Sequence, residues 1–354
     1  RPRVPARPET ARRHPQARHH CRPTQQRLTY ITPYCRAASG GPAFFVSKNS
    51  SLMAVFGNIS IHLWPIDYFC RMKKFKTYIV IAISACIVGA CDMLQNQPYT
   101  AQIKGPTNLN TTNAGLIESA GLKPPFKFAF ITDTQGSLND MKSALDIIVE
   151  RGDIDFIIHG GDQTDFGIVK EFVWTRDMLL DTGIPFVSVI GNHDCLGNGN
   201  ATFDYIYGPQ NFSFDAGPVH IMCLNTVALE YDYSRPVPDL VFIEDDIAAA
   251  NKTAATHSIV VMHSRPYDEQ FNNNVAKTFN YYISQLPGMK PEDPRRADGT
   301  CAMSFCLNGH NHSTMVKDIF DNGILYYQCA NIAKRAFFIF TITDDGYEYE
   351  EVDF

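Results

Sequence analysis

From Phe126 onward, short apolar runs alternate with amphipathic stretches. The pattern predicts strands over Phe126–Asp133, Asp155–Asp162 and Pro185–His193, and helices over Ser137–Arg151 and Ile168–Asp181. Units of about 30 residues in this style are typical of βαβ crossovers with parallel strands. Further along the chain, the same reading predicts strands over Val219–Asn225, Ser258–His263, Met303–Leu307, Ile324–Ala330 and Ala336–Thr343, and helices over Pro238–Ala250 and Asn274–Gln285. Because strands follow one another more often in this half, we expect mixed β-sheets packed together with helices outside, and not one parallel sheet.

Polar side chains collect where five of the predicted strands end. The five segments are Ile131–Gln135, Gly160–Asp165, Gly191–Asp194, Val261–His263 and Gly309–His312. Ligands of α/β sheets bind outside the carboxyl ends of strands, so these segments can converge on one place. The set offers oxygen and nitrogen donors without a thiolate, which suits Mn, Fe or Zn better than Cu(I) or an iron–sulfur cluster.

Each segment is weak evidence when taken alone. A Gly-Asp pair at a turn is most often structural, and Asn-His-Asp can be an ordinary loop. Three other histidines, His159, His220 and His257, are expected to be surface or core residues and are assigned no ligand role. The order of all five segments at strand ends carries the argument.

In that order the segments resemble the signature of the calcineurin-like metallophosphoesterases: Asp-x-His, Gly-Asp-x-x-Asp, Gly-Asn-His-(Asp/Glu), a lone His and Gly-His-x-His. The match covers about 126–315, and four of the five blocks agree fully. The resemblance implies an α/β fold of four layers, in which two packed mixed β-sheets are flanked by helices. It places the phosphoesterase domain at 125–354.

The family's roles carry over to this chain block by block. The resemblance implies two divalent metal ions, with Mn or Fe favoured and Zn or Mg as alternatives. Asp162 would bridge the two, and a hydroxide between them would attack phosphorus in line. His193 resembles the catalytic histidine that acts at the leaving-group oxygen, and Asp165 would orient it. The remaining ligands implied are Asp133 and His312 at the first metal and Asn192, His263 and His310 at the second.

One position departs from the family pattern. Gln135 stands where most members have histidine, and an amide oxygen is a weaker donor than imidazole for iron or zinc. Gln135 could ligate, water could take its place, or the first site could be partly occupied; the change favours Mn or Mg over a tightly held Fe–Zn pair. Asp165 occupies the position of the tyrosine expected in purple acid phosphatases, which makes that branch an unfavoured reading.

Charge divides the chain into two parts. The formal net charge of −6 combines a net of +9 over residues 1–71 with a net of −15 over the rest. An acidic main body argues against a protein that binds nucleic acid through a broad basic face, so no nucleic-acid binding is expected.

The segment Met72–Cys91 has the pattern of a secretory signal. Three lysines follow Met72, and 13 mostly apolar residues come after them. The end of this segment, Val88–Cys91, resembles the lipobox of bacterial lipoproteins. The apolar run is shorter than the roughly 20 residues that span a bilayer. We therefore predict a signal peptide over 72–90, lipidation at Cys91, a flexible tether over 91–124 and attachment to the bacterial cell envelope. Residues 1–71 are expected to be disordered or foreign to the natural product.

The leading functional hypothesis is a tethered, metal-dependent phosphoesterase that acts on a small-molecule or lipid phosphate ester. The alternative is a binding or scaffold protein that has kept the fold and lost turnover, which only Gln135 supports. Specificity is assigned to loops 195–215, 228–240 and 265–300. Arg265 could contact phosphate or form a surface salt bridge. Six aromatic residues could stack on the substrate or simply pack in loops: Tyr205, Tyr207, Phe212, Tyr231, Tyr233 and Tyr267.

Overall fold

The computed structural model of the chain describes residues 43–46, 51–56, 59–65, 102–232, 234–289 and 304–354. The predicted signal peptide, Cys91 and Tyr233 lie outside these residues. The chain divides into two units, Arg1–Cys86 and Ile87–Phe354, which are described separately. Among the described residues, no helix combines the length and the apolar character needed to cross a bilayer.

The first unit contains a small antiparallel sheet of three strands, β1 (Ala43–Val46), β2 (Ser51–Phe56) and β3 (Ile59–Pro65). These strands differ from the first alternative for residues 1–71, a disordered segment, whereas the second alternative, a segment foreign to the natural product, stays a prediction. Their sequences are rich in Val, Ile, Phe and Trp, which favour extended backbone.

The second unit is built on two mixed sheets, as the sequence predicts. The five-stranded sheet runs in the order β14 (Tyr347–Asp353), β13 (Ala336–Ile342), β4 (Phe126–Ile131), β5 (Phe156–His159), β6 (Phe186–Ser188). The six-stranded sheet runs in the order β11 (Met315–Asp318), β12 (Leu325–Gln328), β10 (Phe305–Asn308), β9 (His257–Met262), β8 (Val219–Leu224), β7 (Phe212–Ala216). Strands β4–β6 are parallel to one another, and so are β8, β9, β10 and β12.

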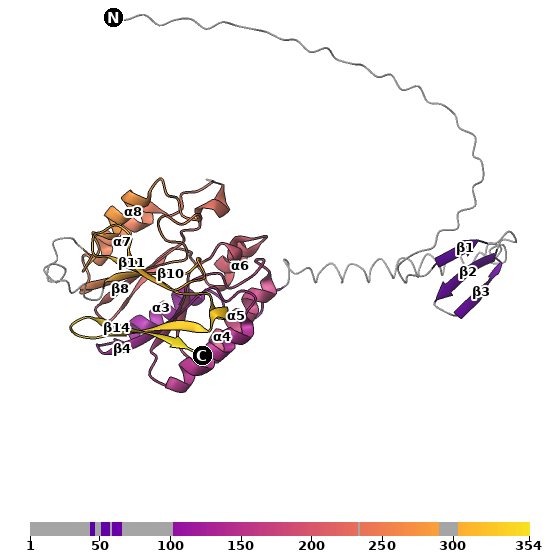
Figure 1. Cartoon of the computed structure of the whole chain (residues 1–354), viewed down its shortest axis with the longest axis horizontal. Helices are drawn as coiled ribbons and strands as arrows, with labels where there is room; N and C mark the ends of the chain where they lie inside the picture. Colours follow the sequence, from indigo (N-terminus) through magenta and orange to yellow (C-terminus); the bar gives the residue numbers. More distant parts are fainter. Residues whose placement is uncertain (1–42, 47–50, 57–58, 66–101, 233, 290–303) are drawn as a thin grey trace, which may run out of the picture. The chain divides into compact units, whose positions relative to one another are not determined.

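Helices cover the outer face of each sheet, which gives four layers (Figure 1). The helices α4 (Leu138–Arg151), α5 (Val169–Asp181) and α6 (Gly199–Ile206) pack on the five-stranded sheet. On the six-stranded sheet lie α7 (Leu240–Ala250) and α8 (Ala276–Ile283). The predicted four-layer fold is confirmed.

The central strands are apolar throughout because both of their faces are buried. In β4, Phe128 and Phe130 point into the core between the sheets, whereas Ala129 and Ile131 face the helices. The same alternation holds in β9, where Ile259 contacts the inter-sheet core and Val260 packs under α7 and α8. This packing fixes the carboxyl ends of the strands, where the polar segments begin.

Helix α3 (Leu109–Ser119) corrects the prediction of a flexible tether that reaches residue 124. It packs against β6 and β7 and buries Asn110 and Asn113. The Asn110 side chain donates to the Ser188 carbonyl at 2.9 Å and accepts from the Ser188 N–H at 2.8 Å. Asn113 donates to the Phe186 carbonyl at 2.7 Å. Polar side chains thus satisfy the edge of β6, which is why a composition that reads as a linker is folded.

Other segments differ from the prediction more locally. Part of the loop predicted over 195–215 is helix α6 and strand β7. The edge strands β11 and β14 were not individually predicted, since both are largely exposed and polar and lack an apolar run.

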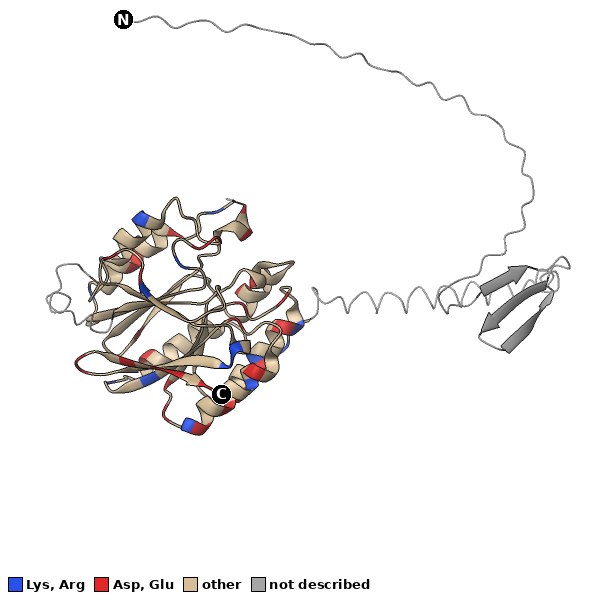
Figure 2. Cartoon of the chain, viewed as in Figure 1, with Lys and Arg blue, Asp and Glu red and all other residues tan. Residues whose placement is uncertain are grey.

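Two of the three histidines without a predicted ligand role, His220 and His257, are buried in the fold. His220 on β8 lies between Asp215 at 2.8 Å and Asp246 of α7 at 2.9 Å. Burial alone lowers the pKa of His220, but the hydrogen bonds and charges of Asp246 and Asp215 outweigh it and raise the pKa. His257 begins β9 and is buried. In Figure 2 acidic residues spread over the helices and β14, with Lys and Arg scattered among them.

We expect the Asn110→Ala variant to lose about 2 to 3 kcal/mol of unfolding free energy, because the Ser188 N–H and carbonyl would be buried without partners. Denaturant unfolding of the full chain measures this loss. The matched control is Thr111→Ala on the exposed side of α3, with an expected change within about 0.5 kcal/mol. Equal, small effects of both substitutions would contradict the role of Asn110.

Candidate metal centre

The polar segments at the strand ends converge, as the sequence predicts. Asp133 follows β4, Asp162 follows β5 and Asn192 follows β6, all in one sheet. His263 follows β9, and His310 and His312 follow β10 of the other sheet. The site therefore lies where the carboxyl ends of both sheets meet.

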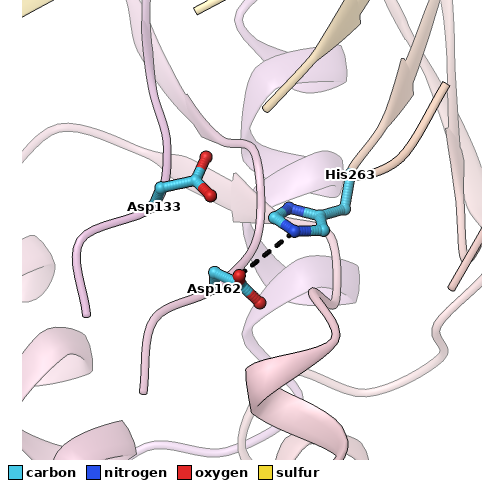
Figure 3. A group of neighbouring side chains, drawn as sticks. All are labelled: Asp133, Asp162 and His263. Atoms are coloured by element: carbon cyan, nitrogen blue, oxygen red, sulfur yellow. Dashed lines mark ion pairs between the residues drawn. The ribbon is translucent and has the colours of Figure 1, made fainter. Parts of the chain in front are cut away.

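Three buried side chains form its centre: Asp133, Asp162 and His263 (Figure 3). One ligand atom from each lies within 4.8 Å of the other two. The Asp162 carboxylate is 3.2 Å from His263 Nε2. The three residues come from three different strand ends, so the tertiary fold alone brings them together.

The backbone of this site is unusual. Four of the predicted ligands have positive φ angles: Asp133 at 51°, Asp162 at 57°, His310 at 71° and His312 at 52°. Left-handed backbone is costly for residues other than glycine and concentrates at functional sites. The surrounding core and hydrogen bonds must hold these residues in place.

Two motif glycines allow the carboxylates to approach the backbone closely. A Cβ on Gly191 would lie 2.1 Å from Asp162 Oδ1. A Cβ on Gly309 would lie 2.3 Å from Asp133 Oδ2. The glycines of the Gly-Asn-His and Gly-His-x-His segments are therefore required by packing at the site itself.

Hydrogen bonds fix one oxygen of each central carboxylate. Asp133 Oδ2 accepts from the Thr132 hydroxyl at 2.6 Å and from the His310 N–H at 3.1 Å. Asp162 Oδ1 accepts from the His193 N–H at 2.9 Å. The remaining oxygens of both carboxylates face the cluster.

Two buried side-chain oxygen atoms at this site could bind a cation. Gln135 Oε1 is buried and has no hydrogen-bond partner. Asp133 Oδ1 is also buried, and its contact with His312 Nε2 is long, at 3.3 Å. Gln135 Nε2 lies 3.4 Å from Asp162 Oδ2 and 3.5 Å from His312 Nε2, so the Gln135 side chain lies beside the first-metal ligands and would ligate after its amide turned to present the oxygen. Burying a carboxylate oxygen without a strong partner is unfavourable in free energy unless a cation binds it. Asp133, Asp162, His312 and the Gln135 amide would hold the first ion.

The second group is equally compact. Asn192 Oδ1 lies 3.2 Å from His263 Nε2 and 3.1 Å from His310 Nδ1. The other nitrogen of His263, Nδ1, is 2.8 Å from the Gly160 carbonyl, the outer-shell contact typical of metal-ligating histidines. Asn192, His263 and His310 could hold the second ion together with Asp162.

The site's own charges favour a cation. Burial alone lowers the pKa of His263, but the charges of Asp162 and Asp133 outweigh it and raise the pKa to about 10. The hydrogen bond with Asp133 raises the pKa of His312. A negative potential that holds protons on these rings also attracts divalent cations, which compete with the protons.

The structure changes the role of Asp165. His193 Nδ1 lies 2.9 Å from the Asp165 main-chain carbonyl, whereas the sequence-based prediction assigned this contact to the carboxylate. A donor hydrogen on Nδ1 leaves Nε2 as the ring nitrogen that can exchange a proton. The Asp165 carboxylate instead lies beside Gly136.

Asp194 is the main residue that sequence reasoning missed. Its buried carboxylate accepts from the N–H groups of Gly191, Gln163 and Thr164 at 3.0, 2.9 and 3.0 Å, and from the Thr164 hydroxyl at 3.0 Å. It thereby ties the Asp162 loop to the Asn192 loop. Burial and the nearby charge of Asp162 raise the pKa of Asp194 to about 7. The sequence indicates Asp194 only by its position directly after His193 in the Gly-Asn-His-Asp segment.

His159 supports the site without entering it. Its Nε2 lies 3.0 Å from the Thr134 hydroxyl, and its Nδ1 accepts from the Gly161 N–H at 3.1 Å. Burial lowers the pKa of His159 to about 3, so the ring is neutral and links two of the polar segments.

Arg265 is engaged within its own loop. Its guanidinium pairs with Asp268 at 3.3 Å and donates to Gln328 Oε1 at 3.2 Å and to the Pro266 carbonyl at 3.0 Å. The predicted contact with phosphate stays a prediction, while the alternative, a salt bridge, is what the structure contains.

The family model of the calcineurin-like phosphoesterases matches residues 126–313, more than half of the chain. The chain belongs to the calcineurin-like phosphoesterase family. As a member of this family, it is a hydrolase of phosphoric esters, and members bind a dimetal centre. No curated protein matches the sequence.

Several solved structures are similar to this phosphoesterase. A dimetal phosphatase from Danio rerio has 11% identity and a TM-score of 0.49, over 65% of this chain and 98% of that one. A purple acid phosphatase from yellow lupin, Lupinus luteus, has 14% identity and a TM-score of 0.43, over 65% of this chain and 52% of that one. At these values neither likeness bears on function.

We expect Gln135→His to raise metal retention after dialysis by about tenfold, equivalent to about 1.4 kcal/mol, because imidazole is a stronger donor than an amide oxygen. Elemental analysis of the full chain measures the bound metal. Gln285→His, at the end of α8, is the remote control. Retention unchanged from the wild type would mean that Gln135 is not a ligand.

Proposed function

We propose that this protein hydrolyses phosphate mono- or diesters at the centre formed by Asp133, Asp162 and His263, and that lipidated Cys91 tethers it to the bacterial cell envelope. The observation that carries the catalytic proposal is the convergence of these three buried groups, with ligand atoms within 4.8 Å of one another, beside His193. Divalent cations bound there would polarise the phosphoryl oxygens and activate a water molecule.

The chain's own residues supply position and proton transfer. The Asp162 carboxylate fixes the backbone of His193 at 2.9 Å, and the Asp165 carbonyl fixes its ring. His193 Nε2 is then available to deliver a proton to the leaving oxygen of the ester. Because the Asp194 hydrogen bonds hold both loops together, His193 keeps its place relative to Asp162.

The second candidate function is that of a binding or scaffold protein that has kept the fold and lost turnover. The observation that favours it is Gln135 in place of the family's usual histidine. The buried Gln135 Oε1, which has no hydrogen-bond partner, weighs against it, because a protein that no longer binds metal would gain stability by pairing or losing this atom.

We expect His193→Ala to lower kcat by about 10²- to 10⁴-fold with unchanged metal content, because the variant lacks only the proton donor. Hydrolysis of 4-nitrophenyl phosphate and bis(4-nitrophenyl) phosphate by the Mn²⁺-loaded full chain measures this and separates monoesterase from diesterase activity. Asp165→Ala is the matched control and should keep most of the activity, since the contact to His193 comes from the main chain. If the metal-loaded wild type hydrolyses no ester, the phosphoesterase proposal is contradicted and the scaffold function is favoured.

For the tether, we expect Cys91→Ser to move the protein from the membrane fraction to the soluble fraction. The sulfur is the only atom of the cysteine side chain to which the lipid can be attached. Cell fractionation with immunoblotting measures the distribution, and Cys195→Ser in the buried core is the control. Continued membrane association of Cys91→Ser would contradict lipidation.

A further inference from the structure

A cavity of about 600 Å³ opens beside the candidate metal centre. His310 and His312 form one wall, and Tyr267, Asp268, Glu269 and Asn273 form another. The second wall belongs to the segment after β9, which no metal-ligand motif includes. A phosphoester bound at the metal centre would extend its alcohol part into such a space.

Tyr267 is held at this cavity by a specific loop. Its φ angle is 69°, which is unfavourable for a bulky side chain. The Asn273 side chain accepts from the Tyr267 N–H at 2.7 Å and donates to the Asp268 carbonyl at 2.8 Å. Asp268 in turn pairs with Arg265, so the loop is braced on both sides of the ring.

The ring of Tyr267 presents a free surface. The side chain is 52% exposed, and the ring centroid lies 5.3 Å from that of Phe320, which supports it from one side. Aromatic rings that are rigidly placed and exposed beside a reactive centre can stack on planar groups.

The other aromatic candidates that the structure describes do not have this position. Tyr207 is fully buried, and Tyr231 is only 8% exposed. Phe212 packs against the inter-sheet core. Tyr205 is exposed on α6 and is not among the described residues that line the cavity.

The cavity also selects by charge. Asp268 and Glu269 line it, while Lys and Arg are absent from its described lining. Glu269 is mostly exposed, with its carboxylate 3.9 Å from His310 Nε2. A second anionic group on the substrate would meet the carboxylate of Glu269, and the described lining offers it no free cation, because Arg265 is engaged by Asp268.

We propose that Tyr267 is a specificity-determining residue that stacks on the alcohol part of the substrate, and that Glu269 restricts that part to planar groups that are neutral or cationic. This inference rests on the proposed phosphoesterase function. It names the substrate class as phosphate esters of planar alcohols without a second anionic group.

Four phosphate monoesters test it on the Mn²⁺-loaded full chain: phenyl, glycerol, 4-(aminomethyl)phenyl and 4-carboxyphenyl phosphate. The ratio of kcat/KM for phenyl over glycerol phosphate reports stacking. The ratio for the aminomethyl over the carboxy compound reports charge selection. Since each ratio compares substrates on one protein sample, incomplete metal loading cancels.

We expect Tyr267→Gly to lower the stacking ratio about fivefold, mainly through a higher KM for phenyl phosphate. Glycine accepts the positive φ, so this variant should fold at least as stably as the wild type. Tyr267→Phe should keep the ratio, and Tyr281→Leu, an exposed tyrosine of α8, is the control. Glu269→Gln should lower the charge ratio about threefold.

Two results would overturn the inference: a stacking ratio that is unchanged in Tyr267→Gly, as equal losses for all four esters would give, or a charge ratio that is unchanged in Glu269→Gln. Both leave the proposed function intact because the wild type still turns over. A wild type that binds metal and hydrolyses neither the four monoesters nor bis(4-nitrophenyl) phosphate would instead overturn the proposed function.

Discussion

Two buried carboxylates, Asp133 and Asp162, impose the main constraint on this structure. Placed together away from water, they are stable only where donors and positive charge surround them. The Thr132 hydroxyl and the N–H groups of His310 and His193 supply part of this, from both halves of the fold. Divalent cations would supply the rest. Because the carboxyl ends of the two sheets meet here, donors from the loops of both sheets reach this pair.

The hydrogen bonds around the site extend to the edge of the sheet. Asn110 of α3 pairs with the main chain of Ser188, and the Ser188 hydroxyl accepts from the Gln163 side chain at 2.8 Å. The Gln163 N–H donates to Asp194, which holds the loops of Asp162 and Asn192. A helix that precedes the matched family region is therefore part of the support of the metal centre.

Charge has opposite meanings on the surface and in the site. Acidic residues scattered over the exterior are solvated and give the body its net negative charge. The buried carboxylates are poised to bind cations, so with metal ions bound the reaction centre would attract phosphate esters despite an acidic exterior. The Glu269 carboxylate, which lines the neighbouring cavity, would then bear on the alcohol part of the proposed substrate.

The sequence by itself determined the layered α/β fold and the segments that meet at the site, because apolar runs and polar strand ends are local patterns. It also marked Gln135 as the departure from the family. It could not assign the His193 contact to the Asp165 main chain, since a main-chain carbonyl has no sequence signal. Nor could it find α3, whose buried asparagines look like a linker until the edge of β6 is beside them. Only the tertiary structure decided which of the described aromatic candidates lines the cavity beside His310 and His312, because that depends on a loop held by Asn273, Asp268 and Arg265.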